Sequence, residues 1–322
     1  MYRFRYAIAA FLAAFLSAPS LALAQKYPDR PIKFVVPFPP GGGNDILARA
    51  THQKLGDLLG QPVVIDNKPG AGGNIGTEFA ARSAADGYTI LIASNQVTIN
   101  PALGQKLPFD IEKDFAPVAL IASVPMLLAV HPSVKAANLA EFIAEAKASP
   151  GNFNHSTPGT GTPQHLAFEV LNHMAGIRVT HVPYKGTGPA IADLLGGQVQ
   201  AAFATLASIE QHVKAGKVRA LAVATPKRSQ AVPTVPSVAE TLRGYDVALW
   251  YSILAPAGTP PDIVARLSAE LGRVMALPEI RERLVAQGFE PGHAGPAELG
   301  DTIRRDLAKW QKFIRDTGLK VD

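Results

Sequence analysis

Short apolar segments alternate with amphipathic segments along nearly the whole chain, and this alternation restricts the possible folds more than any other feature. Residues 32–38 are apolar enough for a strand, and a helical pattern follows from about Asn44 to Leu59, with Gly60 as its end. Residues 62–66 and 88–94 predict two further strands with a helix between them. A strand–helix–strand–helix–strand series predicts a parallel sheet with right-handed crossovers.

A second series of the same kind begins near Pro125. It predicts strands at 126–130, 152–156, 179–184, 199–205 and 218–224, with a helix at 139–148. The last third returns to long helices with apolar stripes at core spacing, and the extended segments 115–130 and 246–255 are long enough to cross between two units. The expected fold class is therefore α/β with two lobes: 25–124 and 249–322 form the first lobe, and 125–248 form the second.

The first 24 residues have the pattern of an export signal. Arg3 and Arg5 precede a short apolar run, and Ala22-Leu23-Ala24 is typical of a cleavage site, so we expect cleavage near Ala24 and a periplasmic protein. A short membrane anchor is the alternative. Cleavage would lower the net charge from +5 to +3. The sequence shows no basic stripe interleaved with aromatic residues, so nucleic-acid binding is not expected.

Cysteine is absent, which excludes disulfides, thiolate metal sites and a lipid-modified cysteine at the cleavage point. Four histidines (155, 165, 173 and 181) form a loose series, but no metal-binding motif accompanies them, and we expect no metal. The glycines at 70–76 miss the dinucleotide-binding spacing, and no phosphate-binding P-loop occurs, so no cofactor is expected.

Three strands are each followed by a glycine-rich turn that opens a helix, at Pro39–Asn44, Gly70–Asn74 and Thr157–Thr162. A helix N-terminus exposes unpaired N–H groups and carries partial positive charge, so it can bind an anion. The alternative is an ordinary tight connection. These turns contain no Lys or Arg, so a bound carboxylate would depend on backbone N–H and hydroxyl donors. Asp45 either compensates the helix dipole or accepts a ligand hydrogen bond. Tyr184 and Trp250 belong either to the core or to a cleft.

Enzyme motifs are missing. No G-x-S-x-G elbow is present, and although Ser156 and His165 could be imagined as nucleophile and base, no acid is placed by motif to orient the histidine. We therefore expect a binding protein, with a secreted α/β hydrolase as the less favoured alternative.

Several longer motifs resemble the Bug or TctC family, the periplasmic substrate-binding proteins of tripartite tricarboxylate transporters. They cover essentially the whole chain after the signal: Tyr27-Pro28-Asp29-Arg30-Pro31, Val36-Pro37-Phe38-Pro39-Pro40-Gly41-Gly42, Lys68-Pro69-Gly70-Ala71-Gly72-Gly73, Asp86-Gly87-Tyr88, His181-Val182-Pro183-Tyr184-Lys185-Gly186 and Leu254-Ala255-Pro256-Ala257-Gly258-Thr259-Pro260.

The resemblance implies a type II periplasmic-binding-protein fold, with two Rossmann-like lobes and a hinged ligand cleft. It implies that main-chain groups of Phe38–Gly42 and Ser156–Gly161, together with bridging waters, hold a ligand carboxylate. It also implies that residues 93–98, after the third strand, and residues 204–205, after a strand of the second lobe, determine specificity. The expected ligand-binding residues are Phe38, Pro39, Pro40, Gly41, Gly42, Asp45, Ser94, Asn95, Ser156, Thr157, Gly159, Thr160, Gly161, His165, Tyr184 and Thr205.

The same resemblance implies the partners. They are a small organic carboxylate, which the sequence does not identify further, and the membrane permease subunits of a tripartite transporter, with the protein itself a monomer. A receptor that reports its ligand to a membrane sensor is the alternative, since a closed ligand-bound form could serve either output.

Overall fold

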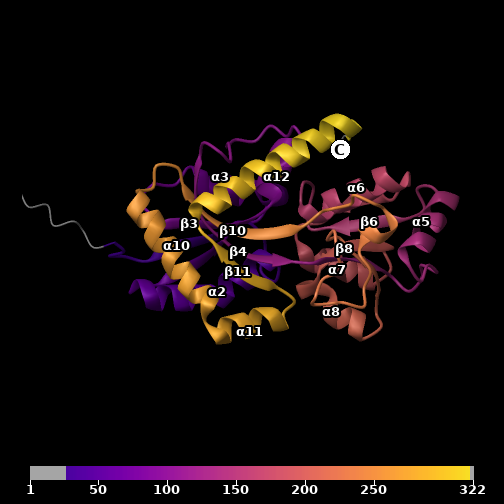
Figure 1. Ribbon diagram of the computed structural model, residues 1–322, viewed down its shortest axis with the longest axis horizontal. Helices are drawn as coiled ribbons and strands as arrows, with labels where there is room; N and C mark the ends of the chain where they lie inside the picture. The colour runs from indigo at the N-terminus through magenta and orange to yellow at the C-terminus, as the bar shows by residue number, and fades with distance from the viewer. Residues whose placement is uncertain (1–26, 320–322) are drawn as a thin grey trace, which may run out of the picture.

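The computed structural model describes residues 27–319 and contains two β-sheets that lie side by side, each flanked by helices (Figure 1). The expected export signal at 1–24 lies outside the described residues. Within the described part of the chain, every helix is too short or too polar to cross a membrane.

The six-stranded sheet of the first lobe has the order β11-β4-β10-β3-β1-β2. Strand β1 pairs in parallel with β2 and β3, which confirms the predicted parallel unit, whereas β10 pairs antiparallel with β3 and β4. The strand bounds are β1 (Ile32–Val36), β2 (Val63–Asn67), β3 (Thr89–Ser94), β4 (Phe115–Val124), β10 (Leu249–Pro256) and β11 (Glu290–Ala294).

Helices cover both faces of this sheet because its central strands are apolar on both sides; every residue of β10 is buried. Gly60 ends the first helix in the left-handed conformation, with φ of 80°, as the sequence predicted. The helices of this lobe are α2 (Gly43–Leu59), the 3-10 turn η1 (Ala71–Gly73), α3 (Asn74–Ala81), α4 (Gln96–Ala102), α10 (Pro261–Ala276), α11 (Pro278–Ala286) and α12 (Pro296–Thr317).

The five-stranded sheet of the second lobe has the order β7-β6-β8-β5-β9. Its strands are β5 (Met126–Val130), β6 (Asn154–Thr157), β7 (Thr180–Pro183), β8 (Ala201–Thr205) and β9 (Arg219–Val223). Its helices are α5 (Leu139–Ala148), which matches the predicted helix residue for residue, α6 (Pro163–Ala175), α7 (Thr187–Leu195), α8 (Leu206–Lys214) and α9 (Val238–Thr241).

The chain crosses between the sheets twice, from β4 to β5 through Pro125 and again between β9 and β10. The long helix α12 also reaches across: it packs on α4 and β4 of the first lobe, and Phe313 near its end contacts His173 of α6 in an edge-on ring pair 5.9 Å apart (Figure 1). The two crossings and the contact of α12 with α6 therefore give three connections between the lobes.

Strand β11 and helix α4 are among the elements that the sequence did not predict. Strand β11 contains Pro291 and Gly292, which are poor strand formers, but it pairs with β4 at the edge of the sheet, where proline is tolerated. Helix α4 is a short helix with Pro101 inside it, and it follows directly on β3.

Candidate functional site

The first lobe presents the N-terminus of α2 to the cleft between the lobes. Gly42 is the N-cap residue, and no side chain caps this helix. The N–H groups in the first turn of a helix have no partner within the helix. Because glycine at 42 and 43 supplies no capping oxygen, the first-turn amides of this 17-residue helix remain available to an anion.

The second lobe presents α6 in the same way. Thr162 is its N-cap residue, but the Thr162 hydroxyl donates to the Gly159 carbonyl at 2.7 Å and makes no capping bond to the helix. Pro163 follows at the first helical position, where its missing N–H costs nothing. Gln164 is therefore the first residue of this helix with a backbone N–H group.

Both helix N-termini line one small cavity of about 20 Å³. That volume accommodates about one water molecule, so the lobes are closed on each other. The walls of the cavity come from both lobes and from the crossing strand β10: Phe38, Gly42, Gly43, Asn44, Ser94, Pro158, Thr162, Pro163, Gln164, Thr187, Leu249 and Tyr251.

A larger cavity of about 410 Å³ lies between the lobes next to the first, and the two share Phe38 and Pro158 as walls. Its lining is mostly apolar, and Lys185 is the charged residue in it. The lining residues are Phe38, Pro39, Pro69, Gly70, Ala71, Gly72, Gly73, Ile75, Pro158, Tyr184, Lys185 and Gly186.

Asp45 holds the turn that precedes α2. Its carboxylate accepts hydrogen bonds from the Gly41 N–H at 3.0 Å, from Arg49 Nε at 2.8 Å and from Asn67 Nδ2 at 3.0 Å. Burial alone would raise the pKa of this carboxyl, but the three hydrogen bonds outweigh burial and hold the pKa below its ordinary value. Asp45 therefore positions the turn through its own hydrogen bonds, while Pro40 and Gly41 lie exposed on the outside of that turn.

The turn between β6 and α6 directs its polar groups into the second lobe. Ser156 Oγ donates to the Ala190 carbonyl at 2.9 Å. The Gly159 N–H donates to Thr157 Oγ1, and the Gly161 N–H donates to His165 Nδ1, both at 3.2 Å. These predicted amide donors are occupied within the lobe, so the donors that face the cavity come from the first turn of α6. Thr160 is half-buried beside this turn.

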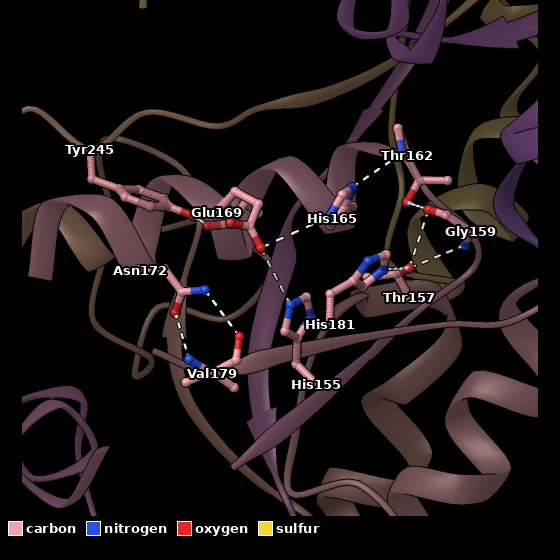
Figure 2. A network of polar contacts seen from close by, with 12 residues as sticks. His155, Thr157, Gly159, Thr162, His165, Glu169, Asn172, Val179, His181 and Tyr245 are labelled. Atoms are coloured by element: carbon pink, nitrogen blue, oxygen red, sulfur yellow. Dashed lines mark hydrogen bonds and ion pairs between the residues drawn. The ribbon is translucent and has the colours of Figure 1, made fainter. Parts of the chain in front are cut away.

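Figure 2 shows three histidines stacked behind this turn, from β6, α6 and β7. The His165 and His181 ring centroids are 3.7 Å apart, and His155 stacks on Phe168 at 3.9 Å. Burial lowers the pKa of His155 to about 3; burial and the neighbouring histidines lower the pKa of His165 to about 2 and that of His181 to about 4. Residues 27–319 contain no group of three or more His, Asp or Glu side chains arranged to hold a metal ion.

The strand ends supply further polar groups. Ser94 Oγ donates to Gln96 Oε1, and Asn95 Nδ2 donates to the Ala248 carbonyl at 3.0 Å, which ties the end of β3 to the crossing segment before β10. The Gln96 amide is completely buried, and its Nε2 has no partner among the described residues. Leaving a buried donor without a partner costs free energy, and Gln96 is not among the residues given above as lining the two cavities.

Two of the predicted residues have partners of their own. Tyr184 Oη donates to Asp193 Oδ2 at 2.5 Å, and burial together with this carboxylate raises the pKa of Tyr184 to about 12; its side chain lines the larger cavity. Thr205 is the N-cap residue of α8, where its hydroxyl contacts Ser208 Oγ at 2.9 Å.

Asn44, the last residue of the predicted turn Pro39–Asn44, lines the cavity, but sequence reasoning missed other cavity residues: Gln164, Thr187, Leu249 and Tyr251. Gln164 follows the predicted turn Thr157–Thr162 by two residues, and the rule that first-turn amides are unpaired could have identified it. Tyr251 packs its hydroxyl against Gly43, where a side chain of any size would collide with it. No pattern in the sequence indicates this long-range contact.

The chain matches the TctC family, described as the tripartite tricarboxylate transporter family receptor, over residues 47–319. It is 38% identical to protein BugT of Bordetella pertussis over 303 residues, which cover 92% of each chain. Among solved structures, a protein from R. palustris with adipate superposes with a TM-score of 0.87 at 34% identity, covering 91% of this chain and 99% of that one. MatC from Rhodopseudomonas palustris with bound malate superposes with a TM-score of 0.85 at 32% identity, covering 89% of this chain and 99% of that one.

The same fold extends to more distant proteins. The alkanesulfonate-binding protein SsuA from Xanthomonas axonopodis pv. citri superposes with a TM-score of 0.52 at 15% identity, over 87% of this chain and 84% of that one. The two-lobed α/β architecture is thus the periplasmic-binding-protein fold that the resemblance implied. By the extent of the family match and the identity to its members, the chain belongs to the TctC family of tripartite tricarboxylate transporter receptors.

Proposed function

We propose that this receptor binds a small organic carboxylate between its lobes and delivers it to the membrane subunits of a tripartite transporter. The observation that carries the proposal is the pair of helix N-termini, α2 and α6, that lack side-chain caps and line the same cavity. Unpaired N–H groups and the positive ends of two helix dipoles there favour a carboxylate over a neutral or cationic group.

Backbone donors are sufficient for the affinity that such a receptor needs. A hydrogen bond to a charged group contributes about 1.5–3 kcal/mol, and micromolar binding requires about 8 kcal/mol. Four or five donors from the two helix turns would reach that value after ordering costs. Because the small cavity holds only about one water molecule, the lobes must part slightly to admit the carboxylate, which then contacts Gly42, Gly43 and Gln164. The rest of the ligand extends past Phe38 and Pro158 into the 410 Å³ cavity.

The family is one of receptors, so the chain binds its ligand without chemical turnover. The protein acts as a monomer in the periplasm after cleavage near Ala24, with lobes at 25–124 plus 249–322 and at 125–248. Capture closes the lobes, and the closed form docks on the permease. Relatives solved with adipate and malate support a carboxylate ligand.

The test is to introduce a carboxylate that competes with the ligand. In Thr162→Asp, the new side chain would cap α6 itself, because Thr162 already has the extended backbone of an N-cap residue, with φ of −76° and ψ of 157°. We expect wild-type residues 25–322 to bind at least one acid from a panel of malate, adipate, benzoate and citrate in calorimetry. Thr162→Asp should bind it at least ten-fold more weakly without loss of thermal stability.

The matched control is Gly295→Asp. Gly295 is the N-cap residue of α12, also has extended backbone and has open space around it, so the variant adds a capping carboxylate away from the cavity. It should bind the acid like wild type. Failure of wild type to bind any organic acid in an extended panel, or equal binding by Thr162→Asp, would contradict the proposal.

A further inference from the structure

The stacked histidines in Figure 2 have no role in the proposed ligand contacts, yet one of them bonds to the turn that opens α6. His165 is only 2% exposed, and its Nδ1 accepts the Gly161 N–H at 3.2 Å. An imidazole nitrogen can accept a hydrogen bond only when it carries no proton. The contact with Gly161 therefore requires His165 to be neutral and to carry its proton on Nε2.

The other side of the ring supports this tautomer. His165 Nε2 lies 3.8 Å from Glu169 Oε1, one turn further along α6, so the Nε2 proton faces a carboxylate. A carboxylate near one nitrogen of a ring favours the proton on that side and makes the opposite nitrogen a better acceptor. The His165 ring therefore contacts Glu169 through Nε2 and the Gly161 backbone through Nδ1. The same Glu169 oxygen also lies 3.8 Å from His155 Nε2.

The neighbours of the ring keep it neutral. His181 of β7 stacks on His165 at 3.7 Å, and His155 of β6 lies 6.4 Å from it. These two histidines and Glu169 are the titratable groups that face His165 from β7, β6 and α6. A second charged imidazolium in this stack would be repelled by the first, and burial disfavours charge on each ring. Burial lowers the pKa of all three histidines.

The contact with His165 holds the Gly161 end of the turn, whereas other hydrogen bonds, among them that from the Thr162 hydroxyl to the Gly159 carbonyl, hold Gly159. Gly161 has φ of 76°, a conformation that only glycine adopts readily, and Gly159 has φ of 149°. Glycine has wide conformational freedom, so a hydrogen bond to its N–H helps to keep it in one conformation. His165 fixes Gly161, while His181 Nε2 contacts Thr157 Oγ1 at 2.7 Å, and that hydroxyl accepts the Gly159 N–H.

We propose that His165 is a positioning residue: as a neutral tautomer with its Nε2–H toward Glu169, it fixes the Gly161 end of the 157–162 turn and so aims the first-turn amides of α6 into the ligand cavity. This rests on the proposed function for the identity of the site. The sequence pattern had placed His165 among the ligand contacts; in this proposal it acts from behind the turn.

The experiment compares two substitutions of His165. In His165→Asn, Oδ1 occupies nearly the position of Nδ1 and can accept the same N–H, whereas His165→Leu fills similar space without an acceptor. By hydrogen exchange without ligand, we expect the Gly161 amide to exchange at least ten-fold faster in His165→Leu than in wild type, and to stay near the wild-type rate in His165→Asn. Affinity for the acid that wild type binds should follow the same order.

A second measurement on wild type covers the case in which His165→Leu does not fold. Nitrogen-15 spectra of the imidazoles should show His165 neutral, with its proton on Nε2, at pH 5.5. An Nδ1–H tautomer, a charged ring at that pH, or equal exchange in the leucine and asparagine variants would overturn the proposal. If wild type binds no acid while exchange behaves as expected, the proposed function fails and the fixing of the turn by His165 stands.

Discussion

Asp45 is the residue on which the turn before α2 depends. Its side chain is 3% exposed and accepts hydrogen bonds from a backbone N–H, an arginine and an asparagine. The sequence left open whether this acid compensates the helix dipole or accepts from a ligand. Its carboxylate oxygens are instead engaged by groups of its own lobe, and the turn that it holds carries Gly42 to the cavity.

We predict that Asp45→Asn lowers the free energy of unfolding by about 1.5–3 kcal/mol at pH 7. The asparagine side chain replaces one carboxylate oxygen, which accepts hydrogen bonds, with an NH₂ group, which would point its own hydrogens at a donor. The folded-state pKa of Asp45 is depressed, so its contribution is complete above the unfolded-state value near 3.9 and is lost as pH falls through the folded-state pKa. Urea unfolding should therefore show a difference between wild type and variant that is constant from pH 7 to 5 and shrinks below about pH 4.

The exposed Asp57 on the same helix provides the control, and Asp57→Asn should unfold like wild type at every pH. A difference between Asp45→Asn and wild type that persists unchanged at pH 3 would show that the carboxylate charge is not what holds the turn.

Individual residues also show what sequence could and could not predict of the site. Phe38 and Gly42 follow β1, Ser94 is the last residue of β3, and all three line the small cavity. The carboxyl ends of parallel strands meet at one edge of a sheet, which is where ligands bind in open α/β folds. The roles of Gly159 and Gly161 could not be predicted in the same way. Whether their N–H groups face a ligand or the lobe interior depends on Thr157 and His165 rotamers, and those depend on packing against another strand.

Among the secondary-structure elements, α12 contacts both lobes, since it packs on α4 and β4 and reaches α6 through Phe313. Trp310 on its buried face is 2% exposed and stacks edge-on with Phe313 at 6.2 Å. The helix packs on α4, and Thr98 of α4 donates to Asp306 of α12 at 2.5 Å. The apolar stripe of α12 was predicted as core, and Leu299, Ile303, Leu307 and Trp310 are indeed buried.

Strand β11 was missed because pairing with β4 overrides its poor local propensity.

We predict that Trp310→Ala lowers the free energy of unfolding by about 3–5 kcal/mol, the usual cost of deleting a large buried aromatic side chain. Lys312→Ala removes a side chain of the same helix that is 70% exposed, and it should change stability by less than about 0.5 kcal/mol. Urea unfolding of both variants measures the difference. A loss below about 1 kcal/mol in Trp310→Ala would mean that α12 is not anchored through this residue.

At the scale of the whole molecule, the lobes meet through glycines. A Cβ atom added at Gly72 of the first lobe would lie 2.2 Å from the Thr160 carbonyl oxygen of the second. One added at Gly161 would lie 1.7 Å from Asn100 Oδ1 across the cleft. The closed form therefore needs the absence of side chains at these points. The glycine-rich turns, which the sequence predicted as anion sites, thus allow the two lobes to contact each other closely. The sequence could not indicate this contact, since it exists only when both lobes are folded and closed.

We predict that Gly72→Ala favours the open form. The added methyl group meets a backbone carbonyl that cannot rotate away, so closure must push Thr160 aside or stop short. A ligand that binds only the closed form loses affinity in proportion to the closed population. Affinity for the acid that wild type binds should fall at least ten-fold, and small-angle X-ray scattering at saturating ligand should give a larger radius of gyration than for wild type.

The variant Gly176→Ala is the control that separates the effect of backbone strain from that of the contact between Gly72 and Thr160. Gly176 has φ of 61°, against 62° at Gly72, so alanine suffers the same left-handed strain at both positions, but a Cβ atom at 176 has no neighbour within 4 Å. Gly176→Ala should lose some stability and still close on its ligand with wild-type affinity. If Gly72→Ala also closed fully, the glycine contacts would be a consequence of closure, and the affinity of the receptor would be set by the ligand and the hinge alone.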